Sequence, residues 1–273
     1  MVHPIALCRV RNAAGLWPLP AAAHMMPAMK TVPNTAKIRL YVDHPLGPGQ
    51  TVPLAPPQAH YLFGVMRQGQ GAQVLLFNGT GGEWLAEVRE ARKKGGTLAC
   101  LSQTRPQQMP PDLWLLFAPV KKARTDFIVE KAVELGAARI CPVQTDFTNS
   151  ERIRQDRLQA HAIEAAEQCG GTYVPPVDDL QKLSALLDGW DPARRILFCD
   201  EALADGPAGA LPDTPGPWAI LIGPEGGFSD AERARLAALP HAHATRLGPR
   251  ILRADTAAVA ALTLWQARLG DWR

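Results

Sequence analysis

The sequence lacks any apolar run as long as a transmembrane helix, although 47% of its 273 residues are hydrophobic. A helix that spans a bilayer needs roughly 20 consecutive apolar residues, so we expect no membrane partner. Charge of one sign is not in large excess either, since the formal net charge is +3. Local basic runs at 89–94, 121–124 and 152–157 suit a polyanion such as nucleic acid. Taken alone, these runs are more simply interpreted as solvated surface.

Paired cysteines are also absent. The five cysteines are scattered, odd in number and never spaced as Cys-x-x-Cys, and the seven histidines show no metal-ligand spacing. This distribution argues against a disulfide framework and against a zinc site. We therefore expect a protein of a reducing compartment, the cytoplasm, with no bound metal.

Residues 1–36 contain no acidic side chain and are rich in alanine and proline. Two arginines interrupt the candidate apolar core of a secretory signal, so such a signal is not expected. The composition also fits a transit peptide, and a translation start placed upstream of the real one stays open, with Met25, Met26 or Met29 as initiator. In either case, we predict a disordered or misassigned N-terminal extension.

Strand-length apolar runs alternate with glycine-rich turns between Ile38 and Thr104. The expected strands are Ile38–Val42, Gln73–Phe77, Trp84–Val88 and Thr97–Leu101. A helical turn or two is expected over Ala59–Arg67. The pattern predicts a small β-barrel or curled sheet over 37–105, followed by a proline-rich linker over 106–111.

After Asp112, expected strands alternate with expected helices. The strands are Leu113–Pro119, Arg139–Val143, Arg195–Cys199, Trp218–Ile222 and Ala244–Leu247. The helices are Thr125–Leu135, Arg152–Gln168, Ser229–Leu239 and Thr256–Leu269. This alternation predicts an α/β domain over 112–273, in which helices cover a parallel sheet. Ligands of such sheets bind beyond the carboxyl ends of the strands.

Two glycine-rich turns, Leu221–Ser229 and Leu247–Thr256, lie at such strand ends. Glycine has no Cβ, so the backbone of these turns can approach a ligand closely. Neither turn is a Walker motif or a G-x-G-x-x-G motif. Each turn alone could be a mere tight connection, but the pair predicts one small-molecule pocket built largely from main chain.

Charged residues in and beside these turns are candidates for chemistry. Arg250 and Arg253 could reach a phosphate or a carbonyl, or could be surface arginines at a helix start. Glu225 could accept a ligand hydrogen bond or act as a base, or could bind nearby amides structurally. Asp200 and Glu201 follow another expected strand, so we expect them to line the same pocket.

The two turns, LIGPEGGFSDAE and RLGPRILRADTAAVAAL, closely resemble the SPOUT superfamily of S-adenosylmethionine-dependent RNA methyltransferases. Within it, they are similar to the ribosomal RNA small-subunit methyltransferase E family, which methylates N3 of a specific uridine in 16S rRNA. Further matches are Arg124–Gly136, Glu164–Gly170 and Ile38–Tyr41. The resemblance covers roughly Lys37 to the C-terminus.

This resemblance implies a PUA-like β-barrel for RNA over 37–105 and a SPOUT methyltransferase domain over 112–273. The parallel sheet of that domain is expected to be closed by a C-terminal trefoil knot, an exception to the rule that chains avoid knots. S-adenosylmethionine is expected against the knot loops. The implied cofactor-binding residues are Leu197, Phe198, Cys199, Gly223, Pro224, Glu225, Gly226, Gly227, Leu247, Gly248, Ile251 and Leu252.

The resemblance also implies partners, and the charged residues of the two turns suggest a mechanism. The partners are 16S rRNA, within the assembled small subunit, and a second copy of the chain in a homodimer. We expect Arg253 or Arg250 to stabilise negative charge on a uracil carbonyl and Glu225 to act as the base. The alternatives are a SPOUT methyltransferase for another RNA site and a non-catalytic RNA-binding or ribosome-assembly protein.

The chain departs from the family pattern at three positions. Gly171 and Phe147 stand where an arginine is expected, and Pro176 stands where a glutamate is expected. All three lie outside the two glycine turns. They therefore bear on RNA contacts more than on cofactor binding.

Overall fold

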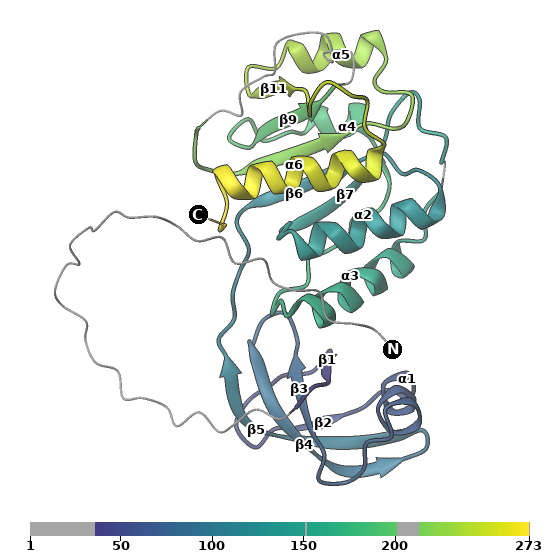
Figure 1. Cartoon of the computed structure of the whole chain (residues 1–273), viewed down its shortest axis with the longest axis vertical. Coiled ribbons are helices and arrows are strands. Elements are labelled where there is room, and N and C mark those ends of the chain that lie inside the picture. The colour runs from purple at the N-terminus through teal and green to yellow at the C-terminus, as the bar shows by residue number, and fades with distance from the viewer. Residues whose placement is uncertain (1–35, 151, 201–212, 273) are drawn as a thin grey trace, which may run out of the picture. The chain divides into compact units, whose positions relative to one another are not determined.

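A computed structural model describes residues 36–150, 152–200 and 213–272 (Figure 1). Apart from Ala36, the N-terminal extension expected over 1–36 lies outside the described residues, and so does Glu201. No helix in the described part of the chain is long and apolar enough to cross a membrane.

The first part of the described chain forms a five-stranded sheet in the order β1-β3-β4-β5-β2. Its strands are β1 (Arg39–Tyr41), β2 (Thr51–Pro53), β3 (Gln73–Phe77), β4 (Glu83–Arg92) and β5 (Gly95–Arg105). β1 pairs with β3 in parallel, and the other pairs are antiparallel. The helical segment expected here is found as α1 (Pro56–Ala59) and η1 (His60–Val65), and it packs on an apolar core that includes Leu62, Leu76 and Leu98.

Two details of this sheet differ from the prediction. β2 was not predicted, because three residues that include a proline carry no alternating pattern. β4 and β5 are longer than expected, since the apolar pattern ends at Val88 while the backbone ladder of the hairpin continues through exposed, charged residues to Arg92.

The second part forms a six-stranded sheet in which every pairing is parallel, in the order β11-β9-β10-β6-β7-β8. Its strands are β6 (Leu113–Phe117), β7 (Arg139–Gln144), β8 (Gln181–Lys182), β9 (Arg195–Cys199), β10 (Trp218–Ile222) and β11 (Ala242–Thr245). Its helices are α2 (Lys122–Glu134), α3 (Gln155–Cys169), α4 (Leu183–Asp188), α5 (Asp230–Ala237) and α6 (Ala254–Arg268). The predicted parallel α/β sheet is therefore confirmed.

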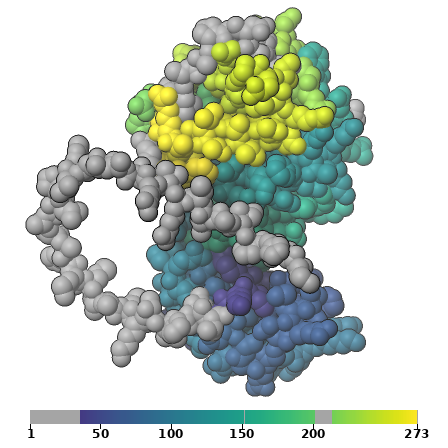
Figure 2. All heavy atoms as spheres, in the orientation of Figure 1, coloured from purple at the N-terminus to yellow at the C-terminus, as the bar shows by residue number. Residues whose placement is uncertain are grey.

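Successive residues of the central strands face opposite sides of this sheet. Leu115 and Ile220 belong to the core under α2, α3 and α6, whereas Leu116 and Leu221 belong to the core on the other face, with residues of α4 and α5. Figure 2 shows the side chains of α6, in yellow, lying against those of α2. Burial on both faces explains why these strands read as continuous apolar runs.

Several boundaries in this part differ from the prediction. α2 begins at Lys122 rather than at Thr125, and α3 begins at Gln155 rather than at Arg152. β11 lies two residues before the predicted Ala244–Leu247, because this edge strand carries a histidine, His243, and only one of its residues, Thr245, is buried. α6 begins at Ala254 rather than at Thr256, with Arg253 as its N-cap residue. The short β8 and α4 were not predicted, since two and six residues carry little periodicity.

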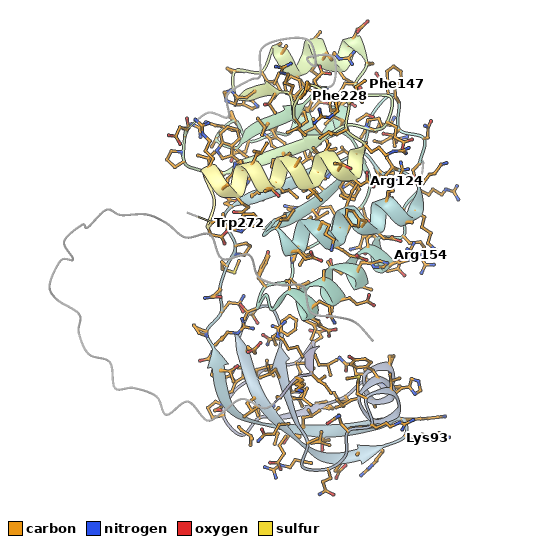
Figure 3. The ribbon with its side chains drawn as sticks, in the orientation of Figure 1. Lys93, Arg124, Phe147, Arg154, Phe228 and Trp272 are labelled. Atoms are coloured by element: carbon orange, nitrogen blue, oxygen red, sulfur yellow. The ribbon has the colours of Figure 1, made fainter. Side chains whose placement is uncertain are left out.

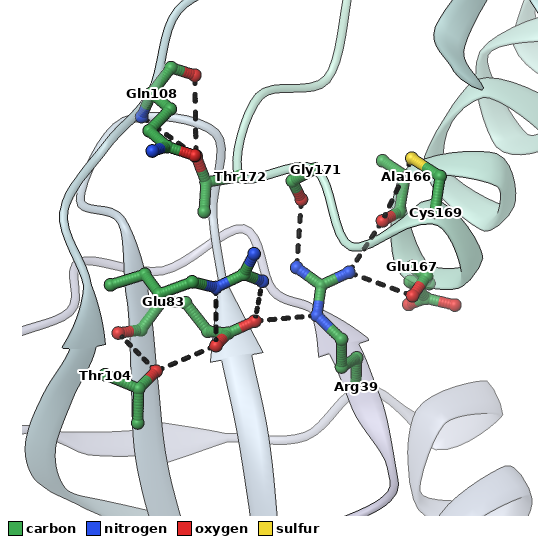
Figure 4. A network of polar contacts seen from close by, with 10 residues as sticks. Arg39, Glu83, Thr104, Gln108, Ala166, Glu167, Cys169, Gly171 and Thr172 are labelled. Carbon is green, nitrogen blue, oxygen red and sulfur yellow. Dashed lines mark hydrogen bonds and ion pairs between the residues drawn. The ribbon is translucent and has the colours of Figure 1, made fainter. Parts of the chain in front are cut away.

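A buried ionic network joins the first sheet to the end of α3 (Figure 4). The Glu83 carboxylate accepts hydrogen bonds from Arg39 Nε at 2.7 Å, from Arg105 Nε at 3.1 Å and from Thr104 Oγ1 at 2.8 Å. Arg39 also donates to the carbonyl oxygens of Ala166, Glu167 and Gly171 at the C-terminus of α3 (2.7 to 2.9 Å). One guanidinium thus satisfies both a buried carboxylate and the open end of a helix.

Candidate active site

The carboxyl ends of three parallel strands lie in register. Cys199 at the end of β9 pairs with Ile222 at the end of β10 and with Thr245 at the end of β11. The segments that leave these strands therefore start side by side at one edge of the sheet. Both predicted glycine turns are among them, which is the position that parallel sheets offer to a ligand.

These segments enclose a hollow, here called the strand-end hollow. It is lined by 199–200 at the end of β9, by 222–224 and Gly227 of the first turn, by 245–246 at the end of β11, and by 247–248 and 250–252 of the second turn. Ala254 and Ala257 of α6 complete the lining. The structure thus places the two turns around one shared hollow.

Most of the residues predicted to bind a cofactor line this hollow. They are Cys199, Gly223, Pro224, Gly227, Leu247, Gly248, Ile251 and Leu252. Arg250, predicted as a catalytic residue, lines it too. Burial raises the pKa of the Cys199 thiol to about 12, so this thiol stays neutral near neutral pH.

Leu197 and Phe198 do not line the hollow. They are 3% and 4% exposed and belong to the cores on the two faces of the sheet. The Phe198 ring lies edge-on to the Phe228 ring, with 6.4 Å between the centroids. Both residues lie inside β9, where successive side chains face opposite sides of the sheet, and only the last residue of the strand, Cys199, lines the hollow.

Glu225 and Gly226, at the tip of the first turn, also lie outside the lining. A Cβ added to Gly226 would lie 3.4 Å from the Cβ of Phe147, so this glycine faces the loop after β7. The Glu225 side chain is about half exposed and forms an ion pair with Arg124 of α2. The turn therefore presents one side to the hollow and the other to α2 and to that loop.

Four charged residues form a cluster beside the hollow, here called the rim cluster. Glu225 is ion-paired with Arg124, and its Oε1 lies 3.6 Å from Nη1 of Arg253. Arg124 Nε lies 3.8 Å from Oδ2 of Asp255, in the first turn of α6. Arg124 thus contacts one residue of each turn. Figure 3 shows Arg124 and Phe147 on the same side of the parallel sheet.

Some lining residues were not among the predicted cofactor residues. Asp200, expected at this edge, is 6% exposed and is ion-paired at 3.1 Å with Arg233 of α5. Thr245 and Arg246 were missed because the predicted β11 was displaced by two residues. Ala254 and Ala257 were missed because small residues inside a helix carry no signal of ligand contact.

Comparisons with known proteins show the family to which the chain belongs. The model of the RNA methyltransferase domain family matches residues 107–266, and that of the RNA methyltransferase PUA domain matches residues 54–99. The ribosomal RNA small subunit methyltransferase E of a Synechocystis strain is 31% identical over 226 residues, or 80% of this chain and 74% of that protein. The chain belongs to the ribosomal RNA small subunit methyltransferase E family. The resemblance drawn from the two glycine turns is confirmed, and the protein is an RNA methyltransferase.

Two solved structures of this fold contain the methyl donor. A methyltransferase of Legionella pneumophila in complex with S-adenosylmethionine is 29% identical, with a TM-score of 0.77 over 86% of this chain and 98% of that chain. The ribosomal RNA small subunit methyltransferase E of Neisseria gonorrhoeae, bound to S-adenosylmethionine, is 27% identical. Its TM-score is also 0.77, and the match covers 86% of this chain and 99% of that chain.

Proposed function

We propose that this protein transfers the methyl group of S-adenosylmethionine to N3 of a specific uridine in 16S rRNA. The observation that carries the proposal is the strand-end hollow, at which two glycine turns meet beside three aligned strand ends. Membership of the ribosomal RNA small subunit methyltransferase E family supports the reaction and the RNA.

The residues of the hollow fit an adenosyl ligand. Ile222, Leu247 and Leu252 offer apolar side chains. A Cβ at Gly223 would lie 3.2 Å from the Phe228 ring, and Gly248 has a φ of +115°. Both positions therefore favour glycine, which leaves main-chain donors and acceptors open to a ligand. We assign adenosyl binding to the eight lining residues that were predicted. Leu197, Phe198 and Gly226 lie outside the lining and hold the strand and the turn that carry those residues.

Bound S-adenosylmethionine supplies a methyl group on a sulfonium centre, open to in-line attack by a nucleophile. Uracil N3 carries a proton and attacks poorly until that proton leaves. Arg250 or Arg253 would donate to a uracil carbonyl oxygen and stabilise the resulting negative charge. Glu225 would accept the proton, which requires its ion pair with Arg124 to open first. The target base must leave its stack to reach these groups.

The finer architecture belongs to the same proposal. Residues 37–105 form a PUA-like β-barrel that binds RNA, 106–111 a linker, and 112–273 a SPOUT domain whose C-terminal segment makes a trefoil knot. The protein acts as a cytoplasmic homodimer on the assembled small subunit. The matched ranges 54–99 and 107–266 support the division, and the knot follows from the resemblance of the two turns to the SPOUT superfamily.

The reaction is tested with the full chain, S-adenosylmethionine and ribosomal subunits from cells that lack the modification. Mass spectrometry of the digested 16S rRNA should show 3-methyluridine, with faster formation on assembled subunits than on bare rRNA. A methyl group on another base or on a ribose would contradict the N3 assignment. Cofactor binding without methyl transfer to either substrate would contradict catalysis.

The assignment of the hollow is tested by filling it. Ala257→Leu places a larger side chain in the lining, and we expect the affinity for S-adenosylmethionine in calorimetry to fall at least about tenfold, or roughly 1.4 kcal/mol. Ala267→Leu, at an exposed position of the same helix, is the control and should bind normally. Equal affinity of the two variants would place the cofactor elsewhere.

A further inference from the structure

A second hollow lies on the other side of the first glycine turn. It is lined by 119–122 at the start of α2, by Asn149 and Ser150 of the loop after β7, and by Pro224 and Glu225. Pro224 also lines the strand-end hollow, so the two hollows share a wall. We call this site the lysine hollow, because Lys121 and Lys122 lie in its lining.

The charge of the lysine hollow suits an anion. Among residues 36–150, 152–200 and 213–272, neither Lys121 nor Lys122 has an ion-pair partner for its ammonium group. The acidic member of the lining, Glu225, is already paired with Arg124. Asn149 and Ser150 add side chains that can bind phosphate or sugar oxygens.

An exposed aromatic ring stands beside this hollow. Phe147 is 47% exposed, and its Cβ faces Gly226, next to Glu225 of the lining. Its neighbours hold the loop in place: Ser229 Oγ donates to Asp146 at 2.5 Å, the Asp146 amide donates to Glu232 at 3.0 Å, and the Thr145 amide donates to Thr148 Oγ1 at 2.9 Å. A large apolar ring is thus kept at the surface on a braced loop instead of packing inward.

We propose that Phe147 and the lysine hollow form a nucleotide subsite for single-stranded RNA next to the methyl-transfer site. One base stacks on the Phe147 ring, and Lys121 and Lys122 contact the phosphates that flank it. Aromatic rings serve as stacking platforms for unpaired bases, and lysines hold the backbone without reading sequence. The subsite holds the strand beside the target uridine. This inference rests on the proposed function, since it requires an RNA substrate.

Cross-linking tests the stacking directly. The full chain is irradiated with a short oligouridylate that carries 5-iodouracil, and the modified peptides are mapped by mass spectrometry. We expect a cross-link at Phe147, reduced by competing unlabelled oligouridylate. Cross-links confined to other residues would overturn the inference.

Variants test the energetics. Phe147→Leu keeps an apolar contact with Gly226 but removes the ring face, and we expect about tenfold weaker binding of oligouridylate. Phe147→Trp should bind at least as well as the wild type. The matched control is Phe127→Leu, which removes another exposed ring, on α2. Lys121→Gln and Lys122→Gln should each reduce the slope of log K against log salt by about one.

Two readouts separate failure of this inference from failure of the proposed function. Wild-type methylation of small subunits reports the proposed function, and the affinity of the Phe147 variants for S-adenosylmethionine reports whether the first turn is intact. Active wild-type enzyme together with normal oligouridylate binding by Phe147→Leu would overturn the subsite alone. We expect Phe147→Leu to raise the KM for the RNA substrate while leaving cofactor affinity unchanged.

Discussion

Two clusters of glutamate and arginine side chains in this molecule differ in how deeply the glutamate is buried. In the network that joins the first sheet to α3, Glu83 is 2% exposed and binds Arg39, Arg105 and Thr104. In the rim cluster, the Glu225 side chain is 47% exposed and binds Arg124, and Arg253 lies 3.6 Å from its carboxylate. In each cluster a glutamate lies between arginines, but only the glutamate of the first cluster is buried.

This difference in burial separates a structural role from a functional one. A buried carboxylate that loses its partners retains the full cost of desolvation, so its cluster must stay intact. An exposed pair contributes little to stability and can open at small cost. The Glu83 network can therefore hold two parts of the chain together, while the rim cluster can rearrange when a substrate arrives.

The largest expected effect is on the buried network. Glu83→Ala leaves Arg39 and Arg105 without their shared carboxylate, and we expect the free energy of unfolding to fall by about 3–5 kcal/mol in urea denaturation. Glu87→Ala on the same strand removes the more exposed ion pair with Arg89 and should cost less than about 1 kcal/mol. Equal losses of stability in the two variants would show that burial does not make the Glu83 network more important for stability than an exposed ion pair.

Acidification should also show how much the buried Glu83 network contributes to stability. Burial alone would raise the pKa of Glu83, but hydrogen bonds from Arg105, Arg39 and Thr104 outweigh it and lower this pKa to about 2 from the ordinary 4.5. The folded state binds this proton less readily than the unfolded state, so the contribution is complete above pH 4.5. The contribution of Glu83 to the free energy of unfolding is lost as the pH falls toward about 2. This contribution amounts to about 3 kcal/mol.

The measurement is the free energy of unfolding of the wild type and of Glu83→Gln across this pH range. The variant should lose less stability on acidification than the wild type, by about 3 kcal/mol. Parallel curves for the two proteins would show that Glu83 titrates normally in the folded state. That result would contradict the role given to Arg39 and Arg105.

The rim cluster should show the opposite balance. Glu225→Gln removes the charge that pairs with Arg124, and we expect a loss of stability below about 1 kcal/mol. Methyl transfer should slow by about a hundredfold or more if Glu225 accepts the N3 proton. The check is kcat at saturating cofactor and RNA, together with thermal unfolding. A normal kcat of Glu225→Gln together with a large loss of stability would show that the rim cluster has a structural role rather than a functional one.

The smallest expected effect concerns Asp255. Asp255→Asn removes a charge that lies 3.8 Å from Arg124 and in the first turn of α6, while its amide oxygen can still accept from the Thr256 amide, and it should change stability by a few tenths of a kcal/mol. We expect the KM for S-adenosylmethionine to rise severalfold, because Asp255 belongs to the second turn and, through Arg124, helps to fix its distance from the first. An unchanged KM in initial-rate measurements would restrict the cluster to Glu225 and its arginines.

Those parts of the fold that burial dictates could be predicted from the sequence. Arg195–Cys199 and Trp218–Ile222 match the observed β9 and β10 to the residue, because strands buried on both faces are continuous apolar runs. β11 was displaced, since an edge strand with polar residues has a weak pattern. The outer half of the β4–β5 hairpin was missed because backbone pairing alone extends it.

In the site, too, some features could be predicted from a local sequence pattern and others could not. The glycine turns were visible in the sequence, because glycine at strand ends reports a backbone requirement. The ion pair of Arg124 with Glu225 was not, since the two residues are 101 positions apart and meet only through the packing of α2 against the turn. The exposure of Phe147 likewise depends on how Asp146 is held by Ser229, which no local pattern encodes.

The central claim is that the two glycine turns bind one adenosyl ligand together. Hydrogen–deuterium exchange of the full chain, with and without S-adenosylmethionine, tests it most directly. We expect peptides covering 221–229 and 245–253 to become protected at the same cofactor concentration, while the exchange of the β4–β5 hairpin does not change. Protection of only one turn, or of neither, at a concentration that saturates binding would contradict it.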